Sequence, residues 1–256
     1  MTRIDHIVGG IHRISTTIDT DGFAFQFNQF LIDDERPALI HTGMHQTYEP
    51  VRDAVAQVLD PARLEYVVLL HFESDECGGM DRFLEGAPDS TLACSALSAD
   101  LNLSGWNYRG RVEGHRDGEV IDLGRHKLRF LETPHVHHWD SMMLFDETTQ
   151  SLFPSDLFIQ PGDQPPVVDE NLGAEMCAFY REVGIFAHED PVRKVVDRIE
   201  RLEPAWVHGM HGGCLPAEAL PPYVRALREN PFAYEGKLLG RPVEGPAYDA
   251  ALRGDP

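Results

Sequence analysis

The sequence predicts an α/β protein folded as a four-layer αββα sandwich, in which two packed β-sheets lie between outer layers of helices. The predicted elements follow the order strands, helices, strands, helices, which is typical of such a layered fold. The run LEYVVLLH at 64–71 is too apolar for a strand with one exposed face, so it is predicted to be a buried central strand. With 256 residues, 42% of them hydrophobic, the chain can bury a sizeable core, and we expect a single domain over residues 1–256.

The first half of the chain is predicted to consist mainly of strands. Apolar and polar residues partly alternate in GFAFQFNQFLID, which is typical of a strand with one face toward the core and the other toward a more polar environment. Helical spacing of apolar residues predicts a helix over 48–59 that ends before Pro61, and a short helix is expected toward Leu103. The strands expected in this half are 9–16, 22–33, 37–43, 64–71 and 90–95.

The second half begins with strands and ends with helices. EVIDLG and HKLRFLET predict a hairpin around Gly124, and 141–156 predicts two further strands joined by an acidic turn. Helices are expected over 174–187 and 190–202, followed by a short strand at AWVHG and a helix after Pro216. Residues 230–256 are rich in proline and glycine and are expected to form an extended C-terminal tail.

Charge and cysteine usage restrict the possible partners and locations. The formal net charge of −20 opposes binding to nucleic acid and to anionic membranes, because both require a basic surface. The sequence has neither a segment resembling a signal peptide nor an apolar run of 18 residues, and its four cysteines form no CxxC pair. We therefore expect a cytoplasmic protein that binds neither nucleic acid nor membrane.

Four motifs place polar side chains directly after predicted strands. They are HFESDE (71–76), TPHVHHWDS (133–141), FPSD (153–156) and HGMHGG (208–213). Any one of them alone is typical of a solvated turn or of a hydrogen-bonded structural histidine. Ligands bind at strand ends in layered α/β folds, so the four together predict a metal site. In the first motif, the period of a strand would point His71, Glu73 and Asp75 to one side, with Phe72 and Ser74 facing elsewhere.

These motifs resemble the metallo-β-lactamase fold superfamily, and within it the branch of the flavodiiron catalytic domain and the stand-alone oxygen-binding diiron proteins. His71, Glu73 and Asp75 match the HxExDH pattern of that branch. PHVHHWDSM resembles its PxxHWPDSM block, which sets the ligand histidine on His137, and Asp156 lies nineteen residues later, at the spacing of the bridging aspartate. The closing HG motif fits His211, with His208 as the poorer candidate. The resemblance covers about residues 8–230 and implies an αββα sandwich with a dinuclear site between the sheets.

The resemblance also implies a role for each ligand. His71, Glu73 and His137 would bind one iron, Asp75 and His211 the other, and Asp156 would bridge the two. Independently of the resemblance, a carboxylate-rich ligand set suits iron or manganese better than zinc, so two iron ions are preferred, with manganese or zinc as possible substitutes. The family motif ends in histidine where this chain has Glu76, which could ligate the second iron, accept a hydrogen bond from bound water, or leave an open position.

Several neighbouring residues are candidates for supporting roles. His135 and His138 flank His137 and are the candidate catalytic residues, since one of them could orient a ligand or face bound dioxygen; plain solvent exposure is the alternative. A buried Trp139 and Asp140 are expected to fix the loop rather than react. Cys77 is expected to be a small buried residue.

Three functions remain open from the sequence. The first is a diiron protein that reduces or activates dioxygen, and the second is an oxygen-binding module with the same site that reports to a partner. The third is a dinuclear hydrolase of an ester, lactone or phosphoester, which is disfavoured because Glu73 replaces the histidine usual in hydrolases of this fold. Flavodiiron reductases take electrons from an attached flavodoxin domain, which is not expected here, so a reductase would need a separate electron donor. The partners expected are dioxygen or a small-molecule substrate and a second copy of the chain in a homodimer.

Overall fold

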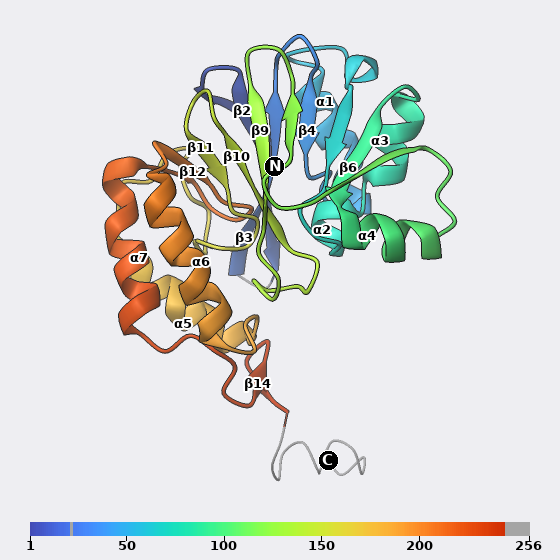
Figure 1. Cartoon of the computed structure of the whole chain (residues 1–256). Coiled ribbons are helices and arrows are strands. Elements are labelled where there is room, and N and C mark those ends of the chain that lie inside the picture. Colours follow the sequence, from blue (N-terminus) through green and yellow to red (C-terminus); the bar gives the residue numbers. More distant parts are fainter. Residues whose placement is uncertain (21–22, 244–256) are drawn as a thin grey trace.

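The computed structural model describes residues 1–20 and 23–243, and its centre is a pair of β-sheets (Figure 1). The N-terminal sheet contains, in spatial order, β1 (Thr2–Val8), β2 (Ile11–Thr20), β3 (Phe23–Ile32), β4 (Ala38–Ile40), β5 (Tyr66–Val68), β6 (Thr91–Ser95) and β7 (Arg111–His115). The C-terminal sheet contains, in spatial order, β13 (Cys214–Pro216), β12 (Trp206–His208), β11 (Ser151–Phe153), β10 (Met142–Asp146), β9 (Lys127–Glu132) and β8 (Val120–Asp122).

Helices cover the outer face of each sheet. The helices α1, α3 and α4 lie beside the N-terminal sheet, whereas α5, α6 and α7 lie beside the C-terminal sheet (Figure 1). The α-helices are α1 (Tyr48–Val55), α2 (Ser74–Cys77), α3 (Met80–Gly86), α4 (Ala96–Ser98), α5 (Gly173–Val183), α6 (Glu189–Leu202) and α7 (Leu220–Glu229). The shorter elements are the 3₁₀ turns η1 (His45–Thr47), η2 (Pro61–Arg63) and η4 (Ala217–Ala219), the π-helical turn η3 (Ala99–Leu103), and a hairpin of β14 (Lys237–Leu238) and β15 (Arg241–Pro242).

The alternation of side chains along the buried strands produces the layers. In β4, Leu39 packs against α1 and α3, whereas Ile40 packs between the two sheets. In β3, Leu31 likewise packs on the side of α1 and α3, whereas Phe30 packs between the two sheets. A third apolar cluster joins the C-terminal sheet to α5, α6 and α7. The predicted four-layer αββα sandwich is therefore confirmed.

Strand direction places the ends of several strands together. The strands β1 to β4 are antiparallel neighbours, while β4 to β7 run parallel and are connected through helices. The strands β8 to β11 form antiparallel pairs, and β11 is parallel to β12. The loops that follow β5 and β11 carry two of the predicted ligand motifs.

The predicted elements are present, together with other strands that were not predicted from the sequence. The exposed strand β7 was missed because its residues are almost all polar or solvent-facing, and β1 because it lacks a regular alternation. The hairpin of β14 and β15 lies inside the predicted tail 230–256, so an entirely extended tail is wrong for its described part; residues 244–256 lie outside the described residues. Contacts with α5 define this hairpin: the Leu239 amide donates to the Val183 carbonyl at 3.0 Å.

Membrane insertion through a helix finds no support in the described residues. Over residues 1–20 and 23–243, no helix is both long enough and apolar enough to cross a bilayer.

Candidate metal centre

Four loops from both sheets bring seven possible metal ligands together. The first group consists of His71, Glu73, His137 and Asp156, and the second of Asp75, Glu76 and His211. Within each group, the ligand atoms all lie within 4.8 Å of one another. All seven predicted metal ligands therefore belong to one of two adjacent groups, although they are separated by up to 140 residues of sequence.

Asp156 lies between the two groups and faces both. Its Oδ2 is 2.8 Å from His137 Nε2 and 3.5 Å from His71 Nε2. Its other oxygen, Oδ1, is 3.3 Å from His211 Nε2 in the second group. One oxygen thus faces each group, which is the geometry that a bridging carboxylate requires.

The segment 71–76 changes conformation halfway along, which corrects the predicted alternation of its side chains. Glu73 is the residue before α2, so Asp75 and Glu76 stand on one helical turn rather than on an extended strand end. The alternation would have joined Asp75 to His71 and Glu73, but Asp75 lies in the second group with Glu76. Phe72 faces elsewhere, as expected, with its ring 5.4 Å from that of Trp106.

Glu76 is a buried carboxyl group that lacks a hydrogen-bond donor. Its side chain is fully buried, and in the described part of the chain neither carboxyl oxygen has a hydrogen-bond partner. Burial, together with the charges of Asp156 and Asp75, raises the pKa of Glu76 well above its usual value. A buried acid without a donor is costly, and a cation beside it removes that cost.

The electrostatics of the first group follow from close contacts between acids and imidazoles. Burial would raise the pKa of Asp156, but the nearby imidazoles of His71, His137 and His211 outweigh burial and hold this pKa well below its usual range. Burial would lower the pKa of His137, but its hydrogen bonds with Asp156 and Glu73 raise it to about 10. Close contacts with the imidazoles of His137 and His71 lower the pKa of Glu73. The carboxylates are thus arranged to hold positive charge.

The ligand atoms that face the interior of the cluster fit a pair of metal ions. In the described chain, His71 Nε2 and Asp156 Oδ1 are buried without a hydrogen-bond partner, as are both oxygens of Glu76. The outer nitrogen of His211, Nδ1, lies 2.7 Å from the Gln26 carbonyl and must donate to it, which leaves Nε2 free to bind a metal. His71 Nδ1 lies 2.8 Å from the Ser155 hydroxyl, so its Nε2 is the nitrogen that faces the cluster.

The residues that position His211 were not predicted from the sequence. Asn28 on β3 donates from Nδ2 to the carbonyls of Gly209 at 2.9 Å and Gly212 at 2.7 Å. Arg13, which is also fully buried, donates to the Gly212 carbonyl at 2.7 Å. The signal in the sequence was the pair of polar residues Gln26 and Asn28 on the same face of a largely hydrophobic strand. These contacts fasten the loop of residues 208–213 to the N-terminal sheet.

Replacing Asn28 with leucine is expected to lower the free energy of unfolding by about 1 to 3 kcal/mol, because the buried Gly209 carbonyl loses its donor, whereas the Gly212 carbonyl keeps the one from Arg13. Urea unfolding of the purified variant measures this change. Gln57→Leu, an amide-to-leucine change at an exposed position, is the matched control and should stay within about 0.5 kcal/mol of the parent. Equal stabilities of the two variants would show that Asn28 does not hold the loop.

The two candidate catalytic histidines occupy different environments. His138 lies beside the cluster, with Nε2 3.8 Å from Glu73 Oε2 and Nδ1 3.5 Å from Asp140 Oδ1. His135 is exposed and belongs to neither ligand group. Asp140 is buried and accepts a hydrogen bond from Ser98, as expected of a residue that fixes the loop. The expected burial of Trp139 is wrong, because this side chain is 51% exposed.

His208, the alternative last ligand, lies outside both groups. It is buried beside Phe30 and Phe153, with Nδ1 3.2 Å from Cys214 Sγ. A further buried histidine that the sequence analysis left without a role, His41, lies behind the cluster with its ring 6.4 Å from that of His71. Burial lowers the pKa of both His41 and His208 to about 3, so both are neutral. Cys77 is partly rather than fully buried.

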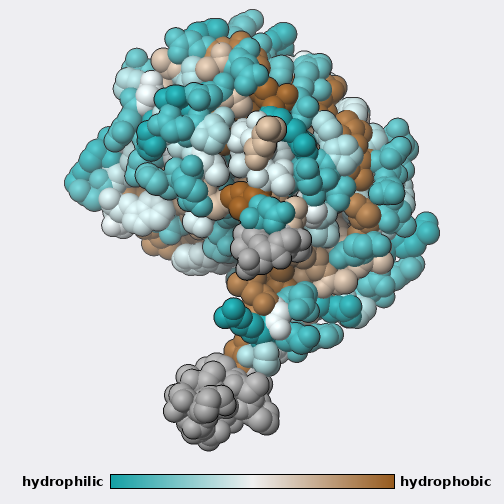
Figure 2. All heavy atoms as spheres, turned by 180° about the vertical axis from the view of Figure 1, so that it is seen from behind, coloured by the Kyte–Doolittle hydropathy of each residue, from teal (hydrophilic) through white to brown (hydrophobic). Residues whose placement is uncertain are grey.

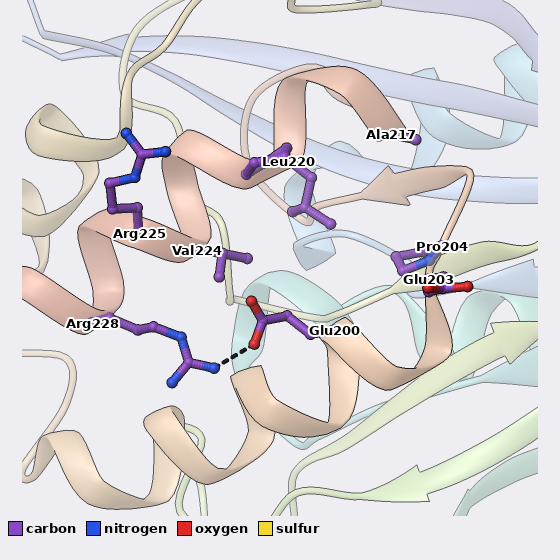
Figure 3. Close-up of a pocket in the computed structure, with 9 residues that line it drawn as sticks. Glu200, Glu203, Pro204, Ala217, Leu220, Val224, Arg225 and Arg228 are labelled. Carbon is purple, nitrogen blue, oxygen red and sulfur yellow. Dashed lines mark hydrogen bonds and ion pairs between the residues drawn. The ribbon is translucent and has the colours of Figure 1, made fainter.

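Two hollows of similar size differ in their chemistry. A cavity of about 610 Å³ opens over both ligand groups. The other, of about 630 Å³, lies between α6 and α7, and Glu200 and Arg228 form an ion pair beside it (Figure 3). Its wall combines apolar side chains such as Leu220 and Val224 with charged ones such as Arg225, and it contains no group of metal ligands among the described residues. The cavity over the ligand groups is therefore the candidate active site.

Two packed sheets with outer helices, and two ligand groups at the loop ends that share one aspartate, define a metallo-β-lactamase fold with a candidate dinuclear centre. Residues 25–212 match the model of the family described as "ODP family beta lactamase", and the chain belongs to this family. The predicted superfamily and branch are thereby confirmed.

Known relatives agree with this placement. A nitric oxide reductase of Moorella thermoacetica is 28% identical over 190 residues, which cover 69% of this chain and 45% of that protein. The chain thus spans less than half the length of this curated relative. The structure of rubredoxin oxygen:oxidoreductase from Desulfovibrio gigas superposes with a TM-score of 0.79 at 21% identity, covering 89% of this chain and 61% of that one. A fragment of diflavin flavoprotein A 5 from Nostoc sp. PCC 7120 has a TM-score of 0.77 at 20% identity, covering 89% and 96%. At these identities the two structures establish the fold.

Proposed function

We propose that this protein is a non-haem diiron protein that binds or reduces a small oxidant, dioxygen or nitric oxide. The observation that carries the proposal is the pair of adjacent ligand groups with Asp156 between them. The names of the relatives support it, since they include a nitric oxide reductase, a rubredoxin oxygen:oxidoreductase and several flavodiiron proteins. Four carboxylates among seven ligands favour iron over zinc.

In this proposal, each ligand has a defined position. His71, Glu73 and His137 would hold the first iron, and Asp75, Glu76 and His211 would hold the second. Asp156 would be a ligand shared by both, as the distances of its two oxygens from His71 and His211 support. The buried oxygens of Glu76, which lack a donor, favour ligation over the two alternatives left open by the sequence.

The protein contributes position, charge and hydrogen bonds to the reaction. When bound, two ferrous ions supply electrons to the oxidant. The anionic ligands stabilise the oxidised, more positive pair of ions, because their charge acts at short range in a buried site. Asp140 and Glu73 lie on opposite sides of the His138 ring, which offers a polar N–H at the edge of the cavity. Phe25 stacks on the His211 ring at 4.6 Å and covers that ligand from solvent.

The electrons for turnover are proposed to come from a separate donor. The four cysteines are free thiols in separate places, so no dithiol pair in the described chain could supply electrons. We also propose that the protein is cytoplasmic, for which its four free cysteines are the support, and that it forms a homodimer. Purified protein run on a calibrated sizing column with light scattering would measure the oligomeric state directly.

The protein made in iron-sufficient cells is expected to contain close to two iron ions per chain, because the ligand set forms two groups. Elemental analysis measures the content. Rapid mixing of the reduced protein with air-saturated buffer is expected to change the visible spectrum, since anionic ligands favour the ferric product. A clean zinc stoichiometry without iron, or an unchanged spectrum with intact iron, would contradict redox function and favour the hydrolase.

A further inference from the structure

The cavity over the metal ligands is far larger than a diatomic oxidant requires. Its volume is about 610 Å³, whereas a water molecule, which is similar in size to dioxygen, occupies about 30 Å³. Cavities of roughly 300 to 1,000 Å³ are typical of sites for drug-sized organic ligands. The surplus volume is therefore space for an organic molecule.

The chemistry of the wall is divided between two ends. Glu73, Asp75 and the ligand histidines form one end, where the metal ions are proposed to lie. The remaining wall is mostly apolar and is formed by Phe25, Ile159, Phe179, Val183, Leu238 and Leu239. Phe25 forms part of this wall, with its ring 4.6 Å from His211 and 5.4 Å from Phe179. A ligand that fills the cavity must be apolar along its body and polar at the metal end.

The rim exposes two leucines that the fold itself does not bury. Leu238 is 49% exposed and Leu239 is 76% exposed, although both line the cavity. The hairpin that carries them is fixed to the end of α5 by hydrogen bonds from the Leu239 amide to Val183 and from the Gly240 amide to Glu182. Figure 2 shows hydrophobic residues (brown) gathered in the lower middle of the face that it presents. An anchored pair of exposed leucines at a cavity mouth is an apolar contact surface.

We propose that this cavity binds an organic molecule with an apolar chain and an anionic oxygen head, such as a medium-chain carboxylic acid, and that Leu238 and Leu239 contact its chain. The proposal rests on the proposed function insofar as the head lies at the metal ions. None of the described residues that line the cavity is a lysine or an arginine, and Glu73, Asp75 and Asp156 line its metal end, so an anionic head would be attracted there by the metal ions that these residues would hold. The apolar wall holds the chain by removing it from water.

Displacement of the fluorescent probe 1-anilinonaphthalene-8-sulfonate by decanoate tests the proposal on the metal-containing protein. Decanoate is expected to displace the probe, acetate is expected not to, and decanol is expected to bind more weakly because it lacks the anionic head. The double variant Leu238→Ser/Leu239→Ser should bind decanoate roughly tenfold more weakly, since two leucine contacts are lost. Leu101→Ser, another exposed leucine that lies on η3, outside the residues that line the cavity, is the control and should bind decanoate as the parent does.

The metal content of every sample separates this proposal from the proposed function. Two iron ions per chain without displacement by decanoate, or with equal affinity in the double variant, would overturn the organic-ligand site and leave the diiron centre intact. If protein that contains no metal binds decanoate as tightly as the metal-containing protein does, then the metal ions do not hold the head and that part of the proposal is wrong. Equal binding of decanol and decanoate would do the same.

Discussion

Replacing Asp156 with alanine is expected to reduce the metal content from two ions per chain to nearly none. The reason is geometric: one Asp156 oxygen lies 3.5 Å from His71 Nε2 and the other 3.3 Å from His211 Nε2, so a single side chain serves both groups. Its removal also leaves His137 without its closest carboxylate partner. Elemental analysis of the purified variant, with circular dichroism as a measure of folding, gives the result.

Asp140→Asn is the matched control for this experiment. Asp140 is also a buried aspartate beside the cluster, but it belongs to neither ligand group and bonds to Ser98. This variant should keep two metal ions per chain. If Asp156→Ala keeps one metal ion, then Asp156 is a terminal ligand of the other and the proposed bridge is wrong.

Replacing Glu76 with glutamine is expected to weaken binding of the second metal by more than about 100-fold, because losing even an indirect partner of a ligand costs about 10- to 100-fold. The carboxyl oxygens of Glu76 are buried and lack a donor within the described chain, so a cation is the partner they require. Competition with a chelator of known affinity measures the loss. The exposed Glu85→Gln on α3 is the control and should bind both metals as the parent does.

The variant Glu76→His addresses the redox role of the same position. It places a neutral imidazole where this chain has a carboxylate, so the oxidised pair loses a stabilising negative charge and the reduction potential is expected to rise. A spectroelectrochemical titration measures the potential, with Glu85→His as the control. An unchanged potential and spectrum, with both metals bound, would place Glu76 outside the ligand set.

Some elements were predictable because their signals are local. The run at 64–71 contains β5, as its continuous apolar character indicated. The hairpin around Gly124 and the strand pair in 141–156 are both present, since turn residues and alternation are properties of short segments. The strand β7 was not predictable in this way: its residues are mostly exposed, and its place comes from pairing with β6.

The candidate site was likewise predictable only in part from the sequence. Its seven residues could be selected from the sequence because strand ends carry ligands in layered folds and because spacing matched a known branch. The resemblance implied the division into two groups, but the strand alternation did not, because residues 74–77 turn into a helix that moves Asp75 away from that alternation. The positions of Asn28 and Arg13 were equally hidden, since their partners lie 181 to 199 residues away.

The sequence by itself determined the layered α/β fold, the seven ligand candidates and the preference for iron, because hydrophobic periodicity and ligand chemistry are local properties of the chain. The tertiary structure decided that His211 rather than His208 faces the cluster, that Glu76 is buried without a donor, and that an apolar cavity opens over the ligands. These features depend on the packing of two sheets and on hydrogen bonds between distant segments. Neither burial nor orientation at such contacts is encoded in the spacing of neighbouring residues.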